Sequence, residues 1–598
     1  MTVITLDWET YFDSDYTLRK LTTEGYIRDP RFEALCLGVK YDERPAVTIP
    51  ATKTQQLRTH IGQAGVVCHH AHFDGLILSH HIGLRPRFWF DTLSMARVVF
   101  PHDKSLSLES LAEKFDIGHK TVPYEEFKGK RGAELDPELY QKLMDGCAQD
   151  VELTHKIFKK LLPLVPKEEL KVIDMTVRMF TEPVLWLDKD RARVYMENLQ
   201  REQEELLRKL NVTKEDLGSA DKFAALLESY GIDPPTKTSP RTGKKAYAFA
   251  KTDQGFLELV NHEQEEIRAL AEARLNTKST IGETRAGRLL SMAERGNLCV
   301  YLKYFGAHTG RWSGGDKLNF QNFPRGGELR KSLLAPDGYV LCVADLSQIE
   351  CRMLNYLARE DWVLKAFKEG RDLYCEMATA FYGRTITKAD KKERFLGKTL
   401  VLGCGYGVGW KKLQGVLKLN GIELSDNEAQ RAVNTYRSKH TKVAELWKHA
   451  DWILSKMYES GQRVPDSKGF ECKWGALEIT DREIYLPNGV CLDYGNLDVD
   501  GKDLVLKNPK GTTKIYGGKL IENVVQALSR VVMSQAMLKI GSFYKVVLTC
   551  HDEIVYLAPE EEADIAMEIG LNLMKQAPLW CKNLPLDAEG GYAREYSK

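Results

Sequence analysis

The sequence predicts an α/β protein of several domains, and three observations support this fold class. The chain has 598 residues, which is too many for one hydrophobic core. Apolar, strand-like runs that end in acidic residues occur at 3–9, 339–345 and 545–553. Long charged segments with helical spacing separate them, at 170–185, 189–210 and 258–274.

Composition limits the function classes. With 43% hydrophobic and 28% charged residues, the chain is typical of water-soluble globular proteins. Its 85 Lys and Arg residues barely exceed its 84 Asp and Glu residues, so a nucleic-acid surface would have to be local. The 12 cysteines form no CxxC pair, which argues against zinc ribbons and disulfide scaffolds and indicates a reducing compartment. No apolar run reaches the roughly 18 residues of a membrane span, so no membrane partner is expected.

Four acidic residues near the N-terminus form a candidate metal site. Asp7 and Glu9 share one face of a predicted strand, because side chains alternate along a strand. Asp74 follows a second apolar run, and Asp150 lies in a long helical segment. Four carboxylates can bind two metal ions, one activating water and the other stabilising the leaving oxygen of a phosphodiester.

A second candidate metal site combines two distant segments. The stretch LCVADLSQIECRMLNYL at 341–357 reads as a buried strand that delivers Asp345, followed by an amphipathic helix. A later strand-like run leads into His551, Asp552 and Glu553. Two strands that each present a carboxylate can hold a pair of divalent cations between them.

One predicted helix places four candidate functional residues in a row along one face. Arg394, Lys398, Leu402 and Tyr406 are each four residues apart, so they predict one stripe about 18 Å long on a helix. Arg and Lys suit phosphates at one end, while Leu and Tyr suit a base and sugar at the other. A cationic surface helix is the alternative. The alternating glycines at 403–409 follow a helix rather than a strand, which excludes a dinucleotide-binding fingerprint.

These motifs resemble a known family. DLSQIE, then RxxxKxxxLGxxYG, then HDE resemble motifs A, B and C of the family A DNA polymerases, which include bacterial DNA polymerase I and many phage replicases. The N-terminal acids, with QDVELT around Asp150, are similar to the 3′–5′ proofreading exonuclease of that family. The resemblance implies an RNase H-like 3′–5′ exonuclease domain followed by a right-hand polymerase with thumb, palm and fingers.

The resemblance also implies domain boundaries. It places an exonuclease-like domain at 1–165, linker helices and thumb at 166–305, the palm at 306–358 and 501–598, and mainly fingers at 359–500. The basic segments 239–253 and 272–280 resemble a thumb that grips duplex phosphates. The thumb is compact, with no insertion for a processivity clamp.

The resemblance assigns roles at the polymerase site. Asp345 and Asp552 are expected to hold two Mg²⁺ ions, with Glu553 as a weaker catalytic candidate. Lys398 is the expected proton donor to pyrophosphate, and Arg394 the phosphate clamp. Further expected contacts of the incoming nucleotide are Gln348, Glu350, Leu402 and Tyr406, with Glu350 covering the ribose edge and Tyr406 bonded to it.

The TGRWS and NFQNFPR segments resemble family loops that contact the primer-template. Their polar side chains suit the minor groove, whose acceptors are nearly the same for every base pair. The expected DNA contacts are Arg311, Asn319, Gln321, Asn322, Gln526 and His551.

The exonuclease motif departs from the family at two positions. The resemblance implies Mg²⁺ or Mn²⁺ held by Asp7, Glu9, Asp74 and Asp150. His70 stands where the family has Asn, and Gly146 stands where it has the Tyr that positions the attacking water. We expect a weakened exonuclease, unless Tyr124 or Tyr140 substitutes for that tyrosine.

The sequence therefore predicts a template-directed DNA polymerase that adds deoxynucleotides to a primer 3′ end. No 5′-nuclease domain precedes the exonuclease, which favours a phage-type replicative enzyme. Alternatives are a repair or translesion polymerase without effective proofreading, a single-subunit RNA polymerase and an inactive DNA-binding scaffold. Glu350 and the exonuclease-like domain argue against the RNA polymerase, and intact Asp345 and Asp552 argue against the scaffold.

The expected partners are primer-template DNA and deoxynucleoside triphosphates. We expect a monomer that leaves room for accessory replication proteins. The expected location is the cytoplasm, which is that of a bacterial host if a phage encodes the protein.

Overall fold

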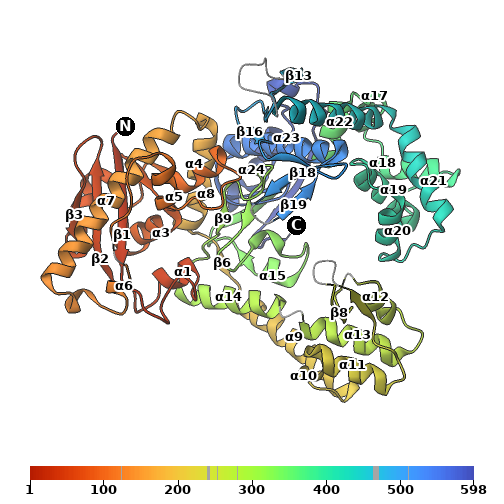
Figure 1. Ribbon diagram of the computed structural model, residues 1–598, viewed down its shortest axis with the longest axis horizontal. Coiled ribbons are helices and arrows are strands. Elements are labelled where there is room, and N and C mark those ends of the chain that lie inside the picture. Colours follow the sequence, from red (N-terminus) through yellow and green to blue (C-terminus); the bar gives the residue numbers. More distant parts are fainter. Residues whose placement is uncertain are drawn as a thin grey trace.

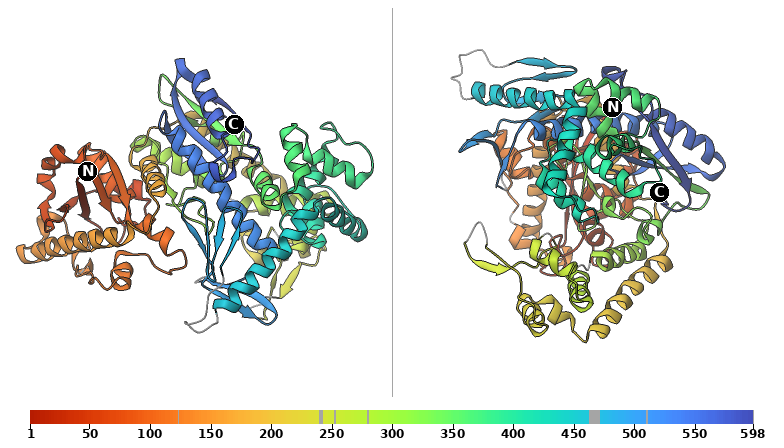
Figure 2. Two further views of the ribbon diagram at one scale, coloured as in Figure 1. Left: turned by 90° about the horizontal axis from the view of Figure 1, so that it is seen from above. Right: turned by 90° about the vertical axis from the view of Figure 1, so that its right-hand side faces the viewer.

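The computed structural model describes residues 1–122, 124–238, 243–251, 253–278, 281–461, 471–508 and 511–597. The N-terminal domain and a group of helices around α18 to α21 lie at opposite ends, with a central sheet between them (Figures 1 and 2). A second helical group projects below (Figure 1). It begins with α10 (Lys214–Gly218) and α11 (Ala220–Ser229) and continues to α13. Parts of the predicted basic thumb segments, 239–242, 252 and 279–280, fall outside the described residues. No helix in the described part of the chain has the length and apolarity to cross a membrane.

The N-terminal domain is built on a five-stranded sheet of order β3-β2-β1-β4-β5. Strand β1 (Val3–Thr10) pairs antiparallel with β2 (Ala34–Tyr41) and parallel with β4 (Gly65–Cys68). The long helix α7 (Pro137–Leu161) packs against β1 and β2, and Asp136 caps its N-terminus. This packing brings the buried Cys147 and Asp150 of α7 close to the acidic residues of β1. The edge strands are β3 (Val47–Pro50) and β5 (Phe88–Asp91).

The central sheet has the order β20-β21-β12-β22, with all neighbours antiparallel. Strand β12 (Tyr339–Leu346) is central and buried except at its first residue, as its apolar run predicts. Its neighbours are β21 (Glu553–Pro559) and β22 (Ala588–Ala593), and β20 (Lys545–Cys550) lies at the edge. Helices α23 (Gly517–Ile540) and α24 (Ala563–Met574) pack beside this sheet.

The distal helices form their own hydrophobic core. It joins α17 (Asp361–Lys368), α18 (Leu373–Tyr382), α19 (Lys391–Cys404), α20 (Trp410–Lys418) and α21 (Asp426–Lys439). Helix α22 (Thr441–Gly461) and a hairpin, β15 (Glu483–Tyr485) with β16 (Cys491–Asp493), contribute instead to the main core. The segment 359–500, predicted as one unit, therefore contains two packing groups.

The lower helical group also has a separate core, which includes Phe223 and Phe256. Helix α9 (Lys189–Leu210) matches its predicted span. The prediction of one helix at 258–274 is wrong: α12 (Gln254–Val260) ends before Asn261, and a separate helix, α13 (Glu265–Lys278), begins at Glu265. The preceding turn-rich segment contains a short hairpin, β7 (Thr236–Thr238) with β8 (Lys245–Tyr247). Helix α14 (Ile281–Arg295) packs along α9.

Candidate active sites

Asp345 and Asp552 lie at the same end of the central sheet. Asp345 is the penultimate residue of β12, and Asp552 lies in the tight turn between β20 and β21. The backbone N–H of Leu346 donates to the carbonyl oxygen of Asp552 at 2.9 Å, which fixes the turn beside β12. Burial is the main cause that raises the pKa of Asp552 to about 6; the charge of Arg311 opposes this rise, and the charges of Glu350 and Asp345 contribute to it. Two carboxylates presented at the same end of a sheet can bind hard divalent cations.

Two arginines face these carboxylates. Arg325 Nη2 lies 2.5 Å from Asp345 Oδ2, and Arg311 Nη2 lies 3.9 Å from Asp552 Oδ1. Arg311 also donates to Glu350. Arg325 was not among the predicted site residues, although it is the last residue of the NFQNFPR segment and its position in that loop could have indicated it.

Glu553 does not join the two aspartates as a free ligand. Both of its oxygens accept hydrogen bonds from Arg330 Nη2 at 2.8 Å, and one also accepts from the Tyr596 hydroxyl. Its exposed fraction is 1%, so the carboxylate is buried and already satisfied. This arrangement argues against the catalytic role suggested for Glu553 and indicates a structural ion pair.

The predicted stripe of helix α19 is largely in place. Lys398 and Leu402 are exposed, but α19 ends at Cys404, so Tyr406 lies in the turn beyond the helix rather than on it. The Tyr406 hydroxyl donates to Glu350 Oε2 at 3.3 Å, which confirms the predicted contact. Arg394 Nε donates to Asp372 Oδ2 at 2.9 Å, so its guanidinium is paired in this state. Gln348 is exposed just before α16 (Ile349–Ala358).

The predicted DNA-contact residues divide into two kinds. Gln321 is buried and donates to the carbonyl oxygen of Thr549 at 3.1 Å, while Asn319 accepts from the backbone N–H of Gln321 at 2.9 Å. These two residues hold their own loop against β20. Asn322 and His551 are exposed, and His551 has a left-handed φ of 55° in the turn beside Asp552.

A cleft of about 700 Å³ runs between α23 and the N-terminal domain. Gln526 lines it and accepts from the Thr309 hydroxyl at 3.4 Å. Basic side chains line it from both sides, including Arg97, Lys104 and Lys519. A cleft with this charge suits a polyanion.

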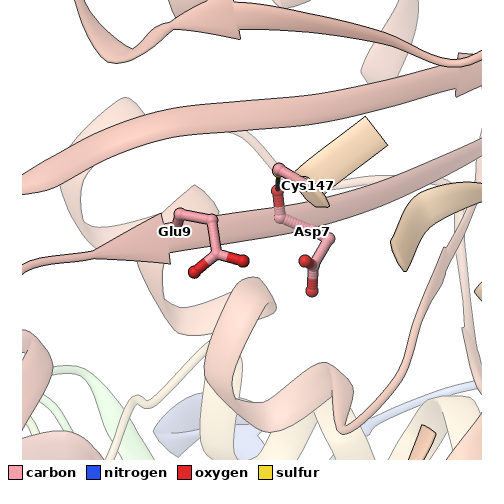
Figure 3. Close-up of side chains that lie close together, drawn as sticks. All are labelled: Asp7, Glu9 and Cys147. Atoms are coloured by element: carbon pink, nitrogen blue, oxygen red, sulfur yellow. Dashed lines mark hydrogen bonds between the residues drawn. The ribbon is translucent and has the colours of Figure 1, made fainter. Parts of the chain in front are cut away.

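The N-terminal acidic residues gather on one side of β1. The carboxylates of Asp7 and Glu9 leave the same side of the strand, and Cys147 of α7 lies beside them (Figure 3). One potential ligand atom from each of the three lies within 4.8 Å of the others. Asp74, on α3 (Ala71–Ile77), accepts from the backbone N–H of Trp8 at 3.1 Å.

These carboxylates are buried close together and raise one another's pKa values. Burial and then the charge of Asp150 raise the pKa of Asp7 to about 7. Burial and then the charge of Asp7 also raise the pKa values of Glu9 and Asp74. A bound divalent cation would relieve this repulsion, and Asp7 and Glu9 lie close enough together to share one, with Asp74 and Asp150 beside them.

Two further side chains reach this acidic cluster. Lys120 Nζ lies 2.5 Å from Asp150 Oδ2, and the Tyr124 hydroxyl lies 3.3 Å from both Glu9 Oε1 and Asp150 Oδ2. Tyr140 is elsewhere, donating to the carbonyl oxygen of Leu35 at 3.2 Å. Of the two tyrosines considered from the sequence, only Tyr124 is therefore at the site. Lys120 was missed, because a lone lysine in a loop carries no sequence signal.

His70 does not lie in a strand. It precedes α3 with a φ of 76°, and its Nε2 lies 2.9 Å from the Tyr301 hydroxyl. His70 therefore links the N-terminal domain to the segment that follows α14.

Comparison with known proteins gives two family matches. Residues 6–166 match the 3′–5′ exonuclease model, and residues 189–460 match the model for DNA polymerase family A. A DNA polymerase of Bacillus phage SP02 is 24% identical over the full length of both chains. DNA polymerase I of Aquifex aeolicus is 24% identical, with 91% of this chain and 90% of that protein covered.

Two further matches are a longer protein and a solved structure. The match to DNA polymerase I of Pseudomonas aeruginosa is 24% identical and covers 85% of this chain but 54% of that protein. The POL domain of Pol1 from M. smegmatis, in complex with DNA primer-template and dNTP, shares the fold with a TM-score of 0.67 and 16% identity. That match covers 100% of this chain and 96% of the other. The chain therefore belongs to the family A DNA polymerases, with a 3′–5′ exonuclease domain ahead of its polymerase domain.

Proposed function

We propose that the chain is a template-directed DNA polymerase that extends a primer 3′ end and proofreads it with the N-terminal exonuclease, as in phage-type replication. The main supporting observation is that Asp345 and Asp552 lie at the same end of the central sheet. The hydrogen bond between Tyr406 and Glu350 connects this end to the turn after α19. In this assignment the palm is the central sheet, the fingers are α17 to α21, and the thumb is the group around α10 to α13.

Asp345 and Asp552 would hold the divalent ions of the polymerase site, and two Mg²⁺ ions bound there would activate the primer 3′-hydroxyl and neutralise the leaving pyrophosphate. Lys398 projects from the exposed side of α19, where it would donate a proton to pyrophosphate. Arg394 would exchange Asp372 for a phosphate of the incoming nucleotide. Glu350 would cover the ribose edge and disfavour a 2′-hydroxyl.

The proposed partners are primer-template DNA and deoxynucleoside triphosphates, which the M. smegmatis POL domain binds in its complex. The basic cleft beside Gln526 suits a nucleic-acid backbone, and exposed Asn322 and His551 lie near the primer end in this assignment. We expect the protein to act as a monomer.

The proofreading site would use Asp7, Glu9, Asp74 and Asp150 to hold Mg²⁺ or Mn²⁺ ions. Hydrolysis there would release nucleotides from a mismatched 3′ end.

Primer extension on a defined template tests the polymerase assignment. Extension with four deoxynucleoside triphosphates and Mg²⁺, but not with ribonucleotides, is the expected result. Efficient extension with ribonucleotides alone would favour an RNA polymerase, and no extension with either set would favour a binding scaffold.

A further inference from the structure

Helix α7 carries a glycine, and therefore no side chain, at position 146 beside the exonuclease site. Gly146 is buried, and a Cβ atom at this position would lie 2.3 Å from Cγ2 of Val122. Because valine is short and branched, it cannot swing away as a flexible side chain can. Val122 therefore occupies the space that a side chain at position 146 would need.

The segment His119–Val122 is fastened in this position at three points. Glu109 accepts from the backbone N–H of Lys120 at 2.6 Å. Gln149 of α7 donates to the carbonyl oxygen of His119 at 2.6 Å and accepts from the Thr121 hydroxyl at 3.0 Å. The segment is thus held along α7, one turn from Asp150.

This placement brings two polar side chains into the acidic cluster. Lys120 Nζ donates to the Tyr124 oxygen at 2.9 Å while it contacts Asp150 at 2.5 Å. The Tyr124 hydroxyl can donate to Glu9 or Asp150, each 3.3 Å away. The exposed fraction of Tyr124 is 37%, so its ring stands at the solvent edge of the site rather than in the core.

We infer that Tyr124 orients the water that attacks the scissile phosphate, and that Lys120 is the positioning residue that fixes the Tyr124 hydroxyl and the Asp150 carboxylate. The absence of a side chain at Gly146 makes this possible, because it lets Val122 approach α7. The inference rests on the proposed exonuclease function.

The reaction is a simple hydrolysis. The water oxygen forms a bond to phosphorus, and the bond between phosphorus and the 3′-oxygen of the shortened strand breaks. One water hydrogen ends on that 3′-oxygen, and the other leaves from the released 5′-phosphate. The Tyr124 hydroxyl keeps its own proton throughout, since its role is to hold the water by a hydrogen bond.

The test compares Tyr124→Phe with Tyr140→Phe as a matched control. Single-turnover excision of a mismatched 3′ end should slow by about 10- to 100-fold in Tyr124→Phe, the scale of a lost positioning group. The KM for the DNA end and the Mn²⁺ affinity by calorimetry should change less than about twofold, because the carboxylates rather than the hydroxyl hold the metal. Tyr140→Phe should match wild type, and primer extension should be unchanged in both.

Substitutions of Lys120 test its role separately. Lys120→Met should slow excision and also tighten Mn²⁺ binding, because it removes a cation from beside the carboxylates. Lys120→Arg should restore most of the excision rate. Gly146→Ala should slow excision as Tyr124→Phe does, by displacing Val122, and Gly146→Tyr should not increase it.

The possible outcomes distinguish a failure of the inference about Tyr124 from a failure of the proposed exonuclease function. Near wild-type excision by Tyr124→Phe, with Asp7→Ala inactive, would overturn the inference and leave the exonuclease assignment standing. Excision that survives Asp7→Ala, or no excision by wild-type protein, would overturn both. Excision at the wild-type rate by Lys120→Met would overturn the positioning role of Lys120.

Discussion

The hydroxyl of Tyr406 donates a hydrogen bond to Glu350 Oε2 at 3.3 Å, across 56 positions of sequence. Arg311 donates to the other oxygen of the same carboxylate. Glu350 is therefore held between the turn after α19 and a loop ahead of the central sheet. This places the carboxylate where the incoming sugar would meet the palm in the proposed enzyme.

Glu350→Ala should increase the use of ribonucleotides relative to deoxynucleotides, by about 10- to 100-fold. The reason is that the side chain no longer blocks the 2′-hydroxyl or leaves it unpaired. Tyr406→Phe should shift the ratio in the same direction but less, because Arg311 still holds Glu350. Single-nucleotide incorporation with matched pairs measures the ratio, and an unchanged ratio in Glu350→Ala would place sugar selection elsewhere.

Leu402→Tyr should relax discrimination against dideoxynucleotides. Leu402 is 43% exposed on α19, so a larger ring can be accommodated there without repacking a core. A tyrosine hydroxyl could replace the missing 3′-hydroxyl interaction of a terminator. Competition between dideoxy- and deoxynucleotides checks this, with exposed Val416 of the neighbouring helix α20 changed to Tyr as the control. Equal termination by wild type and Leu402→Tyr would count against the placement of Leu402.

Glu553→Gln should destabilise the fold more than it impairs chemistry. The change leaves Arg330 buried without its counter-charge, which costs about 3 kcal/mol in similar ion pairs. The free energy of unfolding by urea measures this, with exposed Glu561→Gln as the control. If stability is unchanged but incorporation falls as in a palm aspartate variant, Glu553 acts at the metal site after all.

The exonuclease acids should make stability depend on pH in the absence of metal. Folded Asp7 keeps its proton up to about pH 7 instead of 3.8, so the folded state binds more protons between these values. Metal-free stability should therefore fall as pH rises through this window. In EDTA at pH 8, Asp7→Asn should melt roughly 3 °C above wild type, as for about 1 kcal/mol in a domain of this size.

The same comparison has two internal controls. At pH 4.5 in EDTA the difference between Asp7→Asn and wild type should nearly vanish, because wild-type Asp7 is then protonated as well. With Mg²⁺ at pH 8 the wild type should gain more stability than the variant, since metal binds the folded site. A wild-type melting temperature that is higher at pH 8 than Asp7→Asn in EDTA would contradict this account of Asp7.

The local patterns that could be predicted from sequence were those set by short-range periodicity. The apolar run before Asp345 predicts a buried strand because nearly every residue in it is hydrophobic, and β12 ends where the run ends. The span of α9 and the hairpin at 483–493 follow equally from local spacing and turn residues. The Tyr406 to Glu350 contact was predictable only through the family resemblance, because no local rule joins positions so far apart.

The remaining features depend on tertiary packing. Glu553 follows Asp552 in sequence, but its environment is decided by Arg330 and Tyr596, which come from distant segments. The contacts of Lys120 with the exonuclease acids likewise depend on how Val122 meets Gly146.

The most direct test of the polymerase assignment is the rate of single-nucleotide incorporation by Asp345→Ala and Asp552→Ala, measured with primer-template affinity in the same preparations. Both variants should lose several orders of magnitude in rate, about 10³-fold or more, because the carboxylates hold the catalytic ions. Primer-template affinity should change less than about threefold, because phosphate contacts dominate binding. Incorporation near the wild-type rate in either variant would contradict the assignment of this sheet end as the polymerase site.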